Sequence, residues 1–136
     1  YIDGIEFSSH LSRCGRFDDN AARFYAAQIC LALEYVHTFG VCCGFMEHIM
    51  LDRQGYISII HFLLITQEES DTNSEESCYY APEIVAGGKH TRASNIWTFG
   101  CMLFEMLTGL PPFYSQNLQI MNNKIINNTV PSPPFL

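Results

Sequence analysis

The side chains with the most obvious chemistry lie in the middle of the chain, around two cysteines and two histidines. Cys42 and Cys43 are followed closely by Glu47 and His48, and His61 comes further on. Thiolates and imidazoles are zinc donors, whereas magnesium takes oxygen ligands. The spacing matches no zinc signature. A zinc site formed by His48, His61 and a cysteine is therefore one interpretation. The other is an abandoned site in which the functional residues have been substituted.

Two kinds of charged residue are missing from the same part of the chain. No Asp lies between Asp19 and Asp52, and no Lys or Arg lies between Arg23 and Arg53. Phosphoryl transfer needs a carboxylate that orients the nucleophile, oxygen ligands for magnesium, and cations for the developing charge. A loop from this stretch supplies neither a catalytic aspartate nor a cation. Glu47 is the one carboxylate close by.

The element around which the chain is organised is a helix over residues 94–108. This stretch is apolar on nearly every side, which predicts that the helix is buried. Ser94 and Asn95 give it a polar start that could cap free N–H groups, and Gly109 follows as a stop signal. Turn-forming proline segments flank the helix on both sides.

Two helices and a hairpin are expected before the central helix. Residues 1–14 predict a short helix. Asp18 then starts a long core-facing helix, with apolar residues at helical spacing as far as Gly40. Two short apolar runs around a glycine turn predict a β-hairpin over 49–60.

Two further segments differ sharply in composition. Residues 66–77 hold five acidic residues and no basic one, which predicts a mobile loop. Residues 117–128 predict one more helix, which prolines then end.

The composition excludes several classes of protein. The net charge is −7 with only seven Lys and Arg among 136 residues, which argues against nucleic acid or an acidic membrane as a partner. No apolar run approaches the length of a membrane span. The six cysteines show no Cys-x-x-Cys spacing, which favours reduced thiols and a cytoplasmic or nuclear location.

Three motifs follow one another around the central helix: Ala81-Pro82-Glu83, then Asn95-Ile96-Trp97-Thr98-Phe99-Gly100, then Gly109-Leu110-Pro111-Pro112-Phe113. This ordered set resembles the large, C-terminal lobe of a eukaryotic protein kinase. Upstream, Gly15-Arg16-Phe17 and the stretches 22–29 and 33–37 are most similar to the AGC group, the class that contains the cyclic-AMP-dependent kinase.

The resemblance implies an α+β, mainly helical fold. Residues 1–136 would form a partial kinase-like domain, the C-terminal lobe around buried helix 94–108 with its small hairpin at 49–60. The small lobe and the final helices of the family have no counterpart in these residues, and 66–77 takes the place of the activation segment. The structural motif would consist of Ala81, Pro82, Glu83, Asn95, Trp97 and Gly100.

The resemblance also places the catalytic positions, and none of them carries the expected residue. Counting back from 49–52, Cys43 stands at the catalytic Asp position, Phe45 at the Lys position and His48 at the Asn position. His61 stands where the magnesium-binding Asp-Phe-Gly would begin. Glu76 replaces a threonine that bridges the catalytic Asp and Lys.

The resemblance also assigns roles to other positions, and for Glu6 and Glu47 a second interpretation stays open. Glu6 falls where the group often has a glutamate that contacts ribose or a basic substrate side chain, and a solvated carboxylate is the alternative. Glu47 matches a structural residue of the family or acts as a substitute base. Thr72 falls at the activation-loop phosphothreonine, and Asn95 at an aspartate that braces the catalytic loop. Glu83 would lack the arginine that pairs with its counterpart.

These observations favour a catalytically inactive AGC-type pseudokinase that acts through a protein partner, with no cofactor expected. One alternative is a residual ATP-dependent serine/threonine kinase, which would use ATP, magnesium and an upstream small lobe. The other is a non-functional fragment or gene-model product. The oligomeric state is left open.

Overall fold

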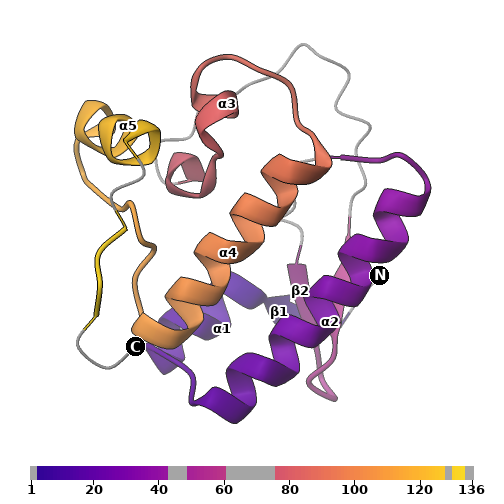
Figure 1. Ribbon diagram of the computed structural model, residues 1–136. Helices are drawn as coiled ribbons and strands as arrows, with labels where there is room; N and C mark the ends of the chain where they lie inside the picture. Colours follow the sequence, from indigo (N-terminus) through magenta and orange to yellow (C-terminus); the bar gives the residue numbers. More distant parts are fainter. Residues whose placement is uncertain (1–2, 43–48, 61–75, 128–129, 134–136) are drawn as a thin grey trace.

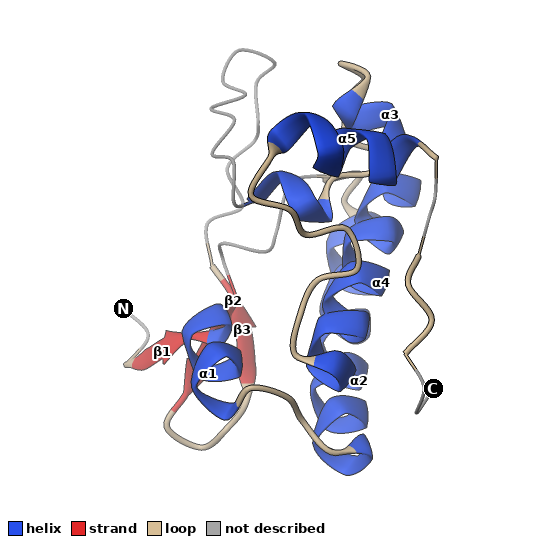
Figure 2. Cartoon of the chain, turned by 90° about the vertical axis from the view of Figure 1, so that its left-hand side faces the viewer, coloured by secondary structure: helices blue, strands red, loops and turns tan. Residues whose placement is uncertain are grey.

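The computed structural model describes residues 3–42, 49–60, 76–127 and 130–133 (Figure 1). Helices make up most of the fold, with a small sheet at one end (Figure 2). In chain order the elements are β1 (Gly4–Glu6), α1 (Phe7–Cys14), α2 (Asp19–Thr38), β2 (Ile49–Asp52), β3 (Ile57–Ile59), the 3₁₀ turn η2 (Glu76–Tyr79), α3 (Pro82–Val85), α4 (Arg92–Thr108) and α5 (Leu118–Ile126).

The sheet has three antiparallel strands in the order β1-β2-β3. The expected hairpin is present, with Met50 opposite Ser58, and its turn is held by the Asp52 side chain, which accepts from the backbone N–H groups of Gln54 and Tyr56. Strand β1 was not expected from the sequence. It pairs with β2 at so close an approach that a Cβ on Gly4 would clash with the Leu51 carbonyl oxygen.

The ends of three helices follow the sequence signals. Asp18 caps α2 by accepting from the Ala21 N–H at 2.8 Å, and Asn117 caps α5 through the N–H groups of Gln119 and Ile120. Gly109 ends α4 in the left-handed conformation, with φ of 90°. These short polar side chains and the glycine satisfy backbone groups that a helix end leaves free.

The start of α4 corrects the expectation for the central helix. The helix begins at Arg92, two residues earlier than expected, and Thr91 rather than Ser94 or Asn95 is its N-cap. Thr91 accepts from the Ser94 N–H while the Ser94 hydroxyl accepts from the Thr91 N–H, at 3.2 Å and 2.8 Å. This reciprocal pair is a capping box, with Ser94 in its second position.

Helix α4 is central but not buried on every side. Its buried residues include Ser94, Asn95, Cys101, Met102 and Met106, and the helix lies between α2 and the α3–α5 pair (Figure 1). Ile96, in contrast, is 55% exposed. An apolar sequence therefore placed the helix in the centre correctly, but it did not predict that one apolar side chain faces solvent.

Among the described residues, the core consists of two clusters that share α4. The first lies between α1, α2, the sheet and α4; its buried members are Phe7, Leu11, Phe17, Ala22, Ile29, Leu33, Ile49, Met102 and Met106. The second joins α4 to α5 and the η2 turn through Cys78, Cys101, Phe113, Met121 and Ile125. Tyr79 packs against both clusters. Within the described residues, no helix is long and apolar enough to cross a membrane.

Candidate functional site on the central helix

A partly buried hydrogen bond fixes the η2 turn on α4. The Tyr79 hydroxyl donates to Glu105 Oε2 at 2.5 Å. The Thr98 hydroxyl donates to the Tyr79 carbonyl oxygen at 3.0 Å, and the Ser94 carbonyl oxygen is a second acceptor for it. Burial, followed by the neighbouring Glu105 charge, raises the pKa of Tyr79, and burial raises the pKa of Glu105. The phenol therefore stays protonated and remains the donor of this hydrogen bond.

A second contact joins the end of α2 to the start of α4. The Arg92 guanidinium donates to the His37 carbonyl oxygen at 2.6 Å. Burial, and then the Arg92 charge, lowers the pKa of His37, so this imidazole is neutral at pH 7. Its Nε2 is buried and has no hydrogen-bond partner among the described residues. The last turn of α2 is therefore anchored to the start of the central helix.

The Ala-Pro-Glu motif forms the short helix α3. Ala81 is its buried N-cap and Pro82 occupies the first turn, where a missing N–H costs nothing. The Glu83 side chain is exposed, and its backbone carbonyl accepts from the Gly88 N–H at 2.7 Å. A Cβ on Gly88 would meet the same carbonyl oxygen at 2.6 Å. The motif therefore builds a tight, backbone-bonded turn beside α5.

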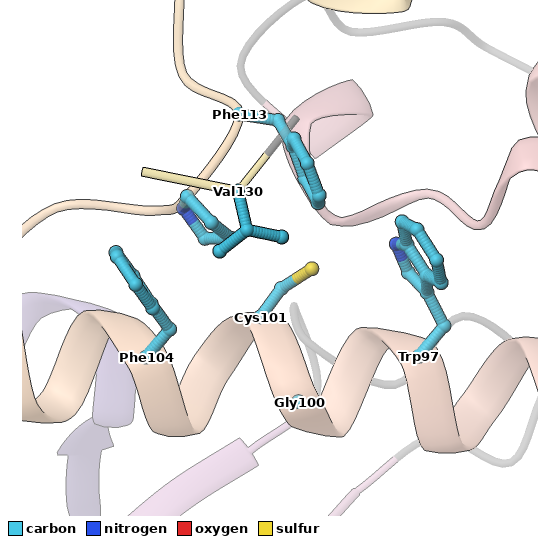
Figure 3. A pocket seen from close by; sticks show the side chains of 7 residues that line it. Trp97, Gly100, Cys101, Phe104, Phe113 and Val130 are labelled. Carbon is cyan, nitrogen blue, oxygen red and sulfur yellow. The ribbon is translucent and has the colours of Figure 1, made fainter. Parts of the chain in front are cut away.

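An apolar pocket of about 210 Å³ opens on the side of α4 that faces the second cluster (Figure 3). The rings of Trp97 and Phe113 stack at 5.5 Å, and the Cys101 thiol points into the space beside them. Burial raises the pKa of Cys101 to about 12, which keeps it a neutral thiol. Trp97 Nε1 is buried without a hydrogen-bond partner among the described residues. The pocket is suited to apolar side chains, not to phosphate or a metal ion.

The predicted site residues fall into two groups. Cys43, Phe45, His48, His61 and Thr72 lie outside the described residues, as do Glu47 and most of 66–77. Both histidines of the zinc interpretation lie there, and among the described residues no three His, Cys, Asp or Glu side chains are grouped to hold a metal.

The remaining site residues are placed by the fold. Glu6 is exposed at the junction of β1 and α1, where its Oε2 lies 3.4 Å from the Ser9 hydroxyl that donates to it. Glu76 begins the η2 turn. Asn95 is buried in the first turn of α4, and Gly100 is exposed at its middle. The structure therefore keeps Glu6 apart from the α4 motif, on the sheet side of the fold.

Sequence reasoning missed the two contacts that anchor the site. Tyr79 and Glu105 lie 26 residues apart, and Arg92 and His37 lie 55 apart. Neither pair has a local pattern that would indicate it. A pairing of that kind depends on how helices pack, which periodicity alone does not determine.

The comparisons with known proteins define the family. The family model described as "Protein kinase domain" matches residues 1–133, so the chain belongs to the protein kinase domain family. Its relatives are AGC-type serine/threonine kinases, which confirms the group expected from the sequence.

Three relatives illustrate the similarity. "Protein kinase 2" of Dictyostelium discoideum is 38% identical over 142 residues, covering 100% of this chain and 30% of that protein. "Serine/threonine protein kinase ypkA" of Aspergillus fumigatus is 39% identical over 140 residues, 98% of this chain and 22% of the relative. "cAMP-dependent protein kinase type 3" of Saccharomyces cerevisiae is 36% identical, covering 99% and 35%. The chain thus spans at most about a third of these relatives.

Proposed function

We propose that this chain is part of a catalytically inactive, AGC-type protein-kinase-like domain that acts by binding a protein partner, as a scaffold or as a decoy for a kinase regulator. The observation that carries the proposal is a contrast within one fold. The central helix and the turns docked on it keep specific hydrogen bonds, while the stretch that would hold the catalytic loop contains no Asp, Lys or Arg.

The retained contacts support a binding role because they hold a surface in place without supplying chemistry. The Tyr79–Glu105 bond and the Arg92–His37 bond fix segments far apart in the chain onto α4. A rigid surface loses little conformational entropy when a partner binds. The acidic segment 66–77 belongs to the proposed partner surface on the strength of its sequence, and its charge excludes nucleic acid from the proposal.

The missing groups argue against phosphoryl transfer. With Cys43 and Phe45 at the catalytic Asp and Lys positions, nothing there orients a hydroxyl or neutralises charge on the phosphates. His48 and His61 would offer imidazoles to magnesium, which prefers oxygen donors. We therefore propose that neither ATP nor magnesium is a cofactor.

The test is magnesium-dependent phosphoryl transfer by the purified natural protein, with any upstream small lobe included. We expect no transfer to itself or to a generic basic peptide above that of a variant whose small-lobe lysine has been removed. Transfer that the lysine variant lacks would overturn the proposal. Capture of a partner that the Tyr79→Phe variant binds more weakly would support it.

A residual kinase activity is the second candidate, because the relatives carry the printed names of serine/threonine kinases. It would need Glu47 as a substitute base. Glu47→Gln should then abolish transfer, whereas Asp19→Asn, at an exposed aspartate in the first turn of α2, should leave it unchanged. Equal activity in the two variants would exclude this mechanism.

A further inference from the structure

Helix α2 carries an exposed apolar stripe on the face opposite the core. We define the aromatic stripe as Phe24, Leu31, Tyr35 and Phe39, which are 48%, 65%, 66% and 66% exposed. The intervals of seven, four and four residues place them along one side of a helix and its end. Buried α2 residues such as Ile29 and Leu33 face α4 instead.

The stripe is continuous with other aromatic side chains. Phe24 lies 6.2 Å from the ring of Tyr56, which is 57% exposed at the hairpin turn, and Tyr35 and Phe39 form an edge-on pair at 5.1 Å. An exposed aromatic patch of this extent is a sign of an interaction surface.

Two opposite charges accompany the stripe on one flank. Arg23 and Glu34 are both exposed and lie about three turns apart, at about 3.6 residues per turn, so they point to nearly the same side of α2. Within the described residues neither has an ion-pair partner. One flank of the helix therefore carries a positive charge near its start and a negative charge towards its end.

We propose that the aromatic stripe docks on α2 of a second copy of this chain, with the two helices antiparallel. In an antiparallel pair related by a two-fold axis, the same flank of each helix faces the other. Arg23 of each copy then lies opposite Glu34 of its partner, so the arrangement is complementary to itself.

The same register packs the stripe against itself. With Arg23 opposite Glu34, Phe24 of one copy falls between Leu31 and Tyr35 of the other, in the manner of a knob in a hole. A parallel pair would instead set this charged flank against the opposite flank, where Ala21 and Ala32 lie, and would lose both ion pairs. The charges thus select one orientation, while the apolar side chains supply most of the affinity.

One pair of helices makes a small interface. Stable complexes bury on the order of 1,200 to 2,000 Å², and contact along a single 20-residue helix falls at or below that range. The expected dimer is therefore weak and depends on protein concentration.

The test is the association of the full natural chain, followed by sedimentation equilibrium from about 1 µM to about 500 µM, a range that brackets a micromolar dissociation constant. Arg23→Glu alone and Glu34→Arg alone each place like charges opposite one another twice, and each should weaken the dimer roughly tenfold. The double variant restores both pairs with their signs reversed, so it should associate like the original chain.

Two further variants separate the stripe from general surface effects. Leu31→Asp should abolish association, whereas Ile120→Asp, at a half-exposed apolar residue on α5, should leave it unchanged. Helical content measured by circular dichroism confirms that each variant is folded. A chain that is monomeric throughout the range, or a double variant that stays as weak as the single ones, would overturn the proposal.

Discussion

Tyr79 and Glu105 form the contact that holds the end of the η2 turn on α4. Their hydrogen bond is 2.5 Å long and partly buried, and Tyr79 packs against both core clusters. A buried acceptor that loses its donor pays a desolvation cost that an exposed one does not. Single substitutions at this pair therefore test whether the turn is held on α4 as the structure shows.

Tyr79→Phe should lower the free energy of unfolding by about 1 to 3 kcal/mol, because it leaves the Glu105 carboxyl buried without its phenol donor. Urea unfolding measures the change. Tyr114→Phe is the matched control: Tyr114 is 45% exposed, and its variant should stay within about 0.5 kcal/mol of the original protein. Equal effects of the two substitutions would mean that the Tyr79 hydroxyl contributes no specific stabilisation.

The raised pKa of Glu105 predicts how the free energy of unfolding depends on pH. Its folded-state pKa lies above the unfolded one, mainly through burial, so the folded protein binds the proton more tightly. At a pH below the unfolded pKa the residue imposes no ionisation cost. The cost grows as pH rises through the unfolded value and is complete above the folded value.

Glu105→Gln removes this titration. The difference in unfolding free energy between Glu105→Gln and the original protein should therefore move in favour of the variant as pH rises from about 4 to about 8. Urea unfolding at each pH measures it, and the other carboxylates cancel in the difference. A difference that is constant with pH would contradict a raised Glu105 pKa.

At the scale of elements, local signals predicted helices and failed where tertiary contacts decide. Asp18, Asn117 and Gly109 mark helix ends because capping depends on neighbours in sequence. Strand β1 has only three residues and exists through its pairing with β2, so no pattern within it was available. The N-cap of α4 is Thr91 and not Ser94, and the prediction missed this because Ser94 could serve either as the first or as the second member of a capping box.

Gly109 does more than end α4. Its φ is 90°, and a Cβ there would lie 2.8 Å from the Gly15 carbonyl oxygen, which belongs to the turn after α1. Gly87 also has a positive φ, of 83°, but a Cβ there would meet nothing within 4 Å. The two glycines thus share a positive φ, which is strained only for a residue with a Cβ, and they differ in close packing.

Gly109→Ala should destabilise the protein more than Gly87→Ala. The left-handed conformation costs an alanine about 1 to 2 kcal/mol at either position, and the clash with backbone adds to it only at Gly109. Thermal unfolding of both variants gives the comparison. Equal losses would show that the turn after α1 moves away without cost.

At the scale of the molecule, the sequence predicted the family and the central helix but not how the core is divided. The three motifs around α4 identified the family, and the apolar stretch 94–108 predicted the central helix. It did not reveal that α4 is shared by two clusters, because that depends on which helices pack on each side. Cys101 and Met102 are neighbours in sequence yet belong to different clusters.

A shared central helix should make the two clusters unfold together. Met106 is fully buried in the first cluster, Met121 is 1% exposed in the second, and the single Trp of the chain, Trp97, packs against the second. Met106→Ala and Met121→Ala should each cost about 2 to 5 kcal/mol through lost contacts and a cavity. Both should shift the unfolding midpoint reported by Trp97 fluorescence, and circular dichroism should give the same midpoint.

The Met106→Ala variant decides whether the two clusters unfold together, because its cavity lies in the cluster to which Trp97 does not belong. If its circular dichroism midpoint falls while the Trp97 fluorescence midpoint stays at the original value, the clusters unfold separately and α4 does not couple them. If the two midpoints fall together, a cavity on the α2 side of α4 also destabilises the region of the Trp97–Phe113 stack, and α4 couples the two clusters. Ile120→Ala, at a half-exposed residue of α5, should shift neither midpoint appreciably.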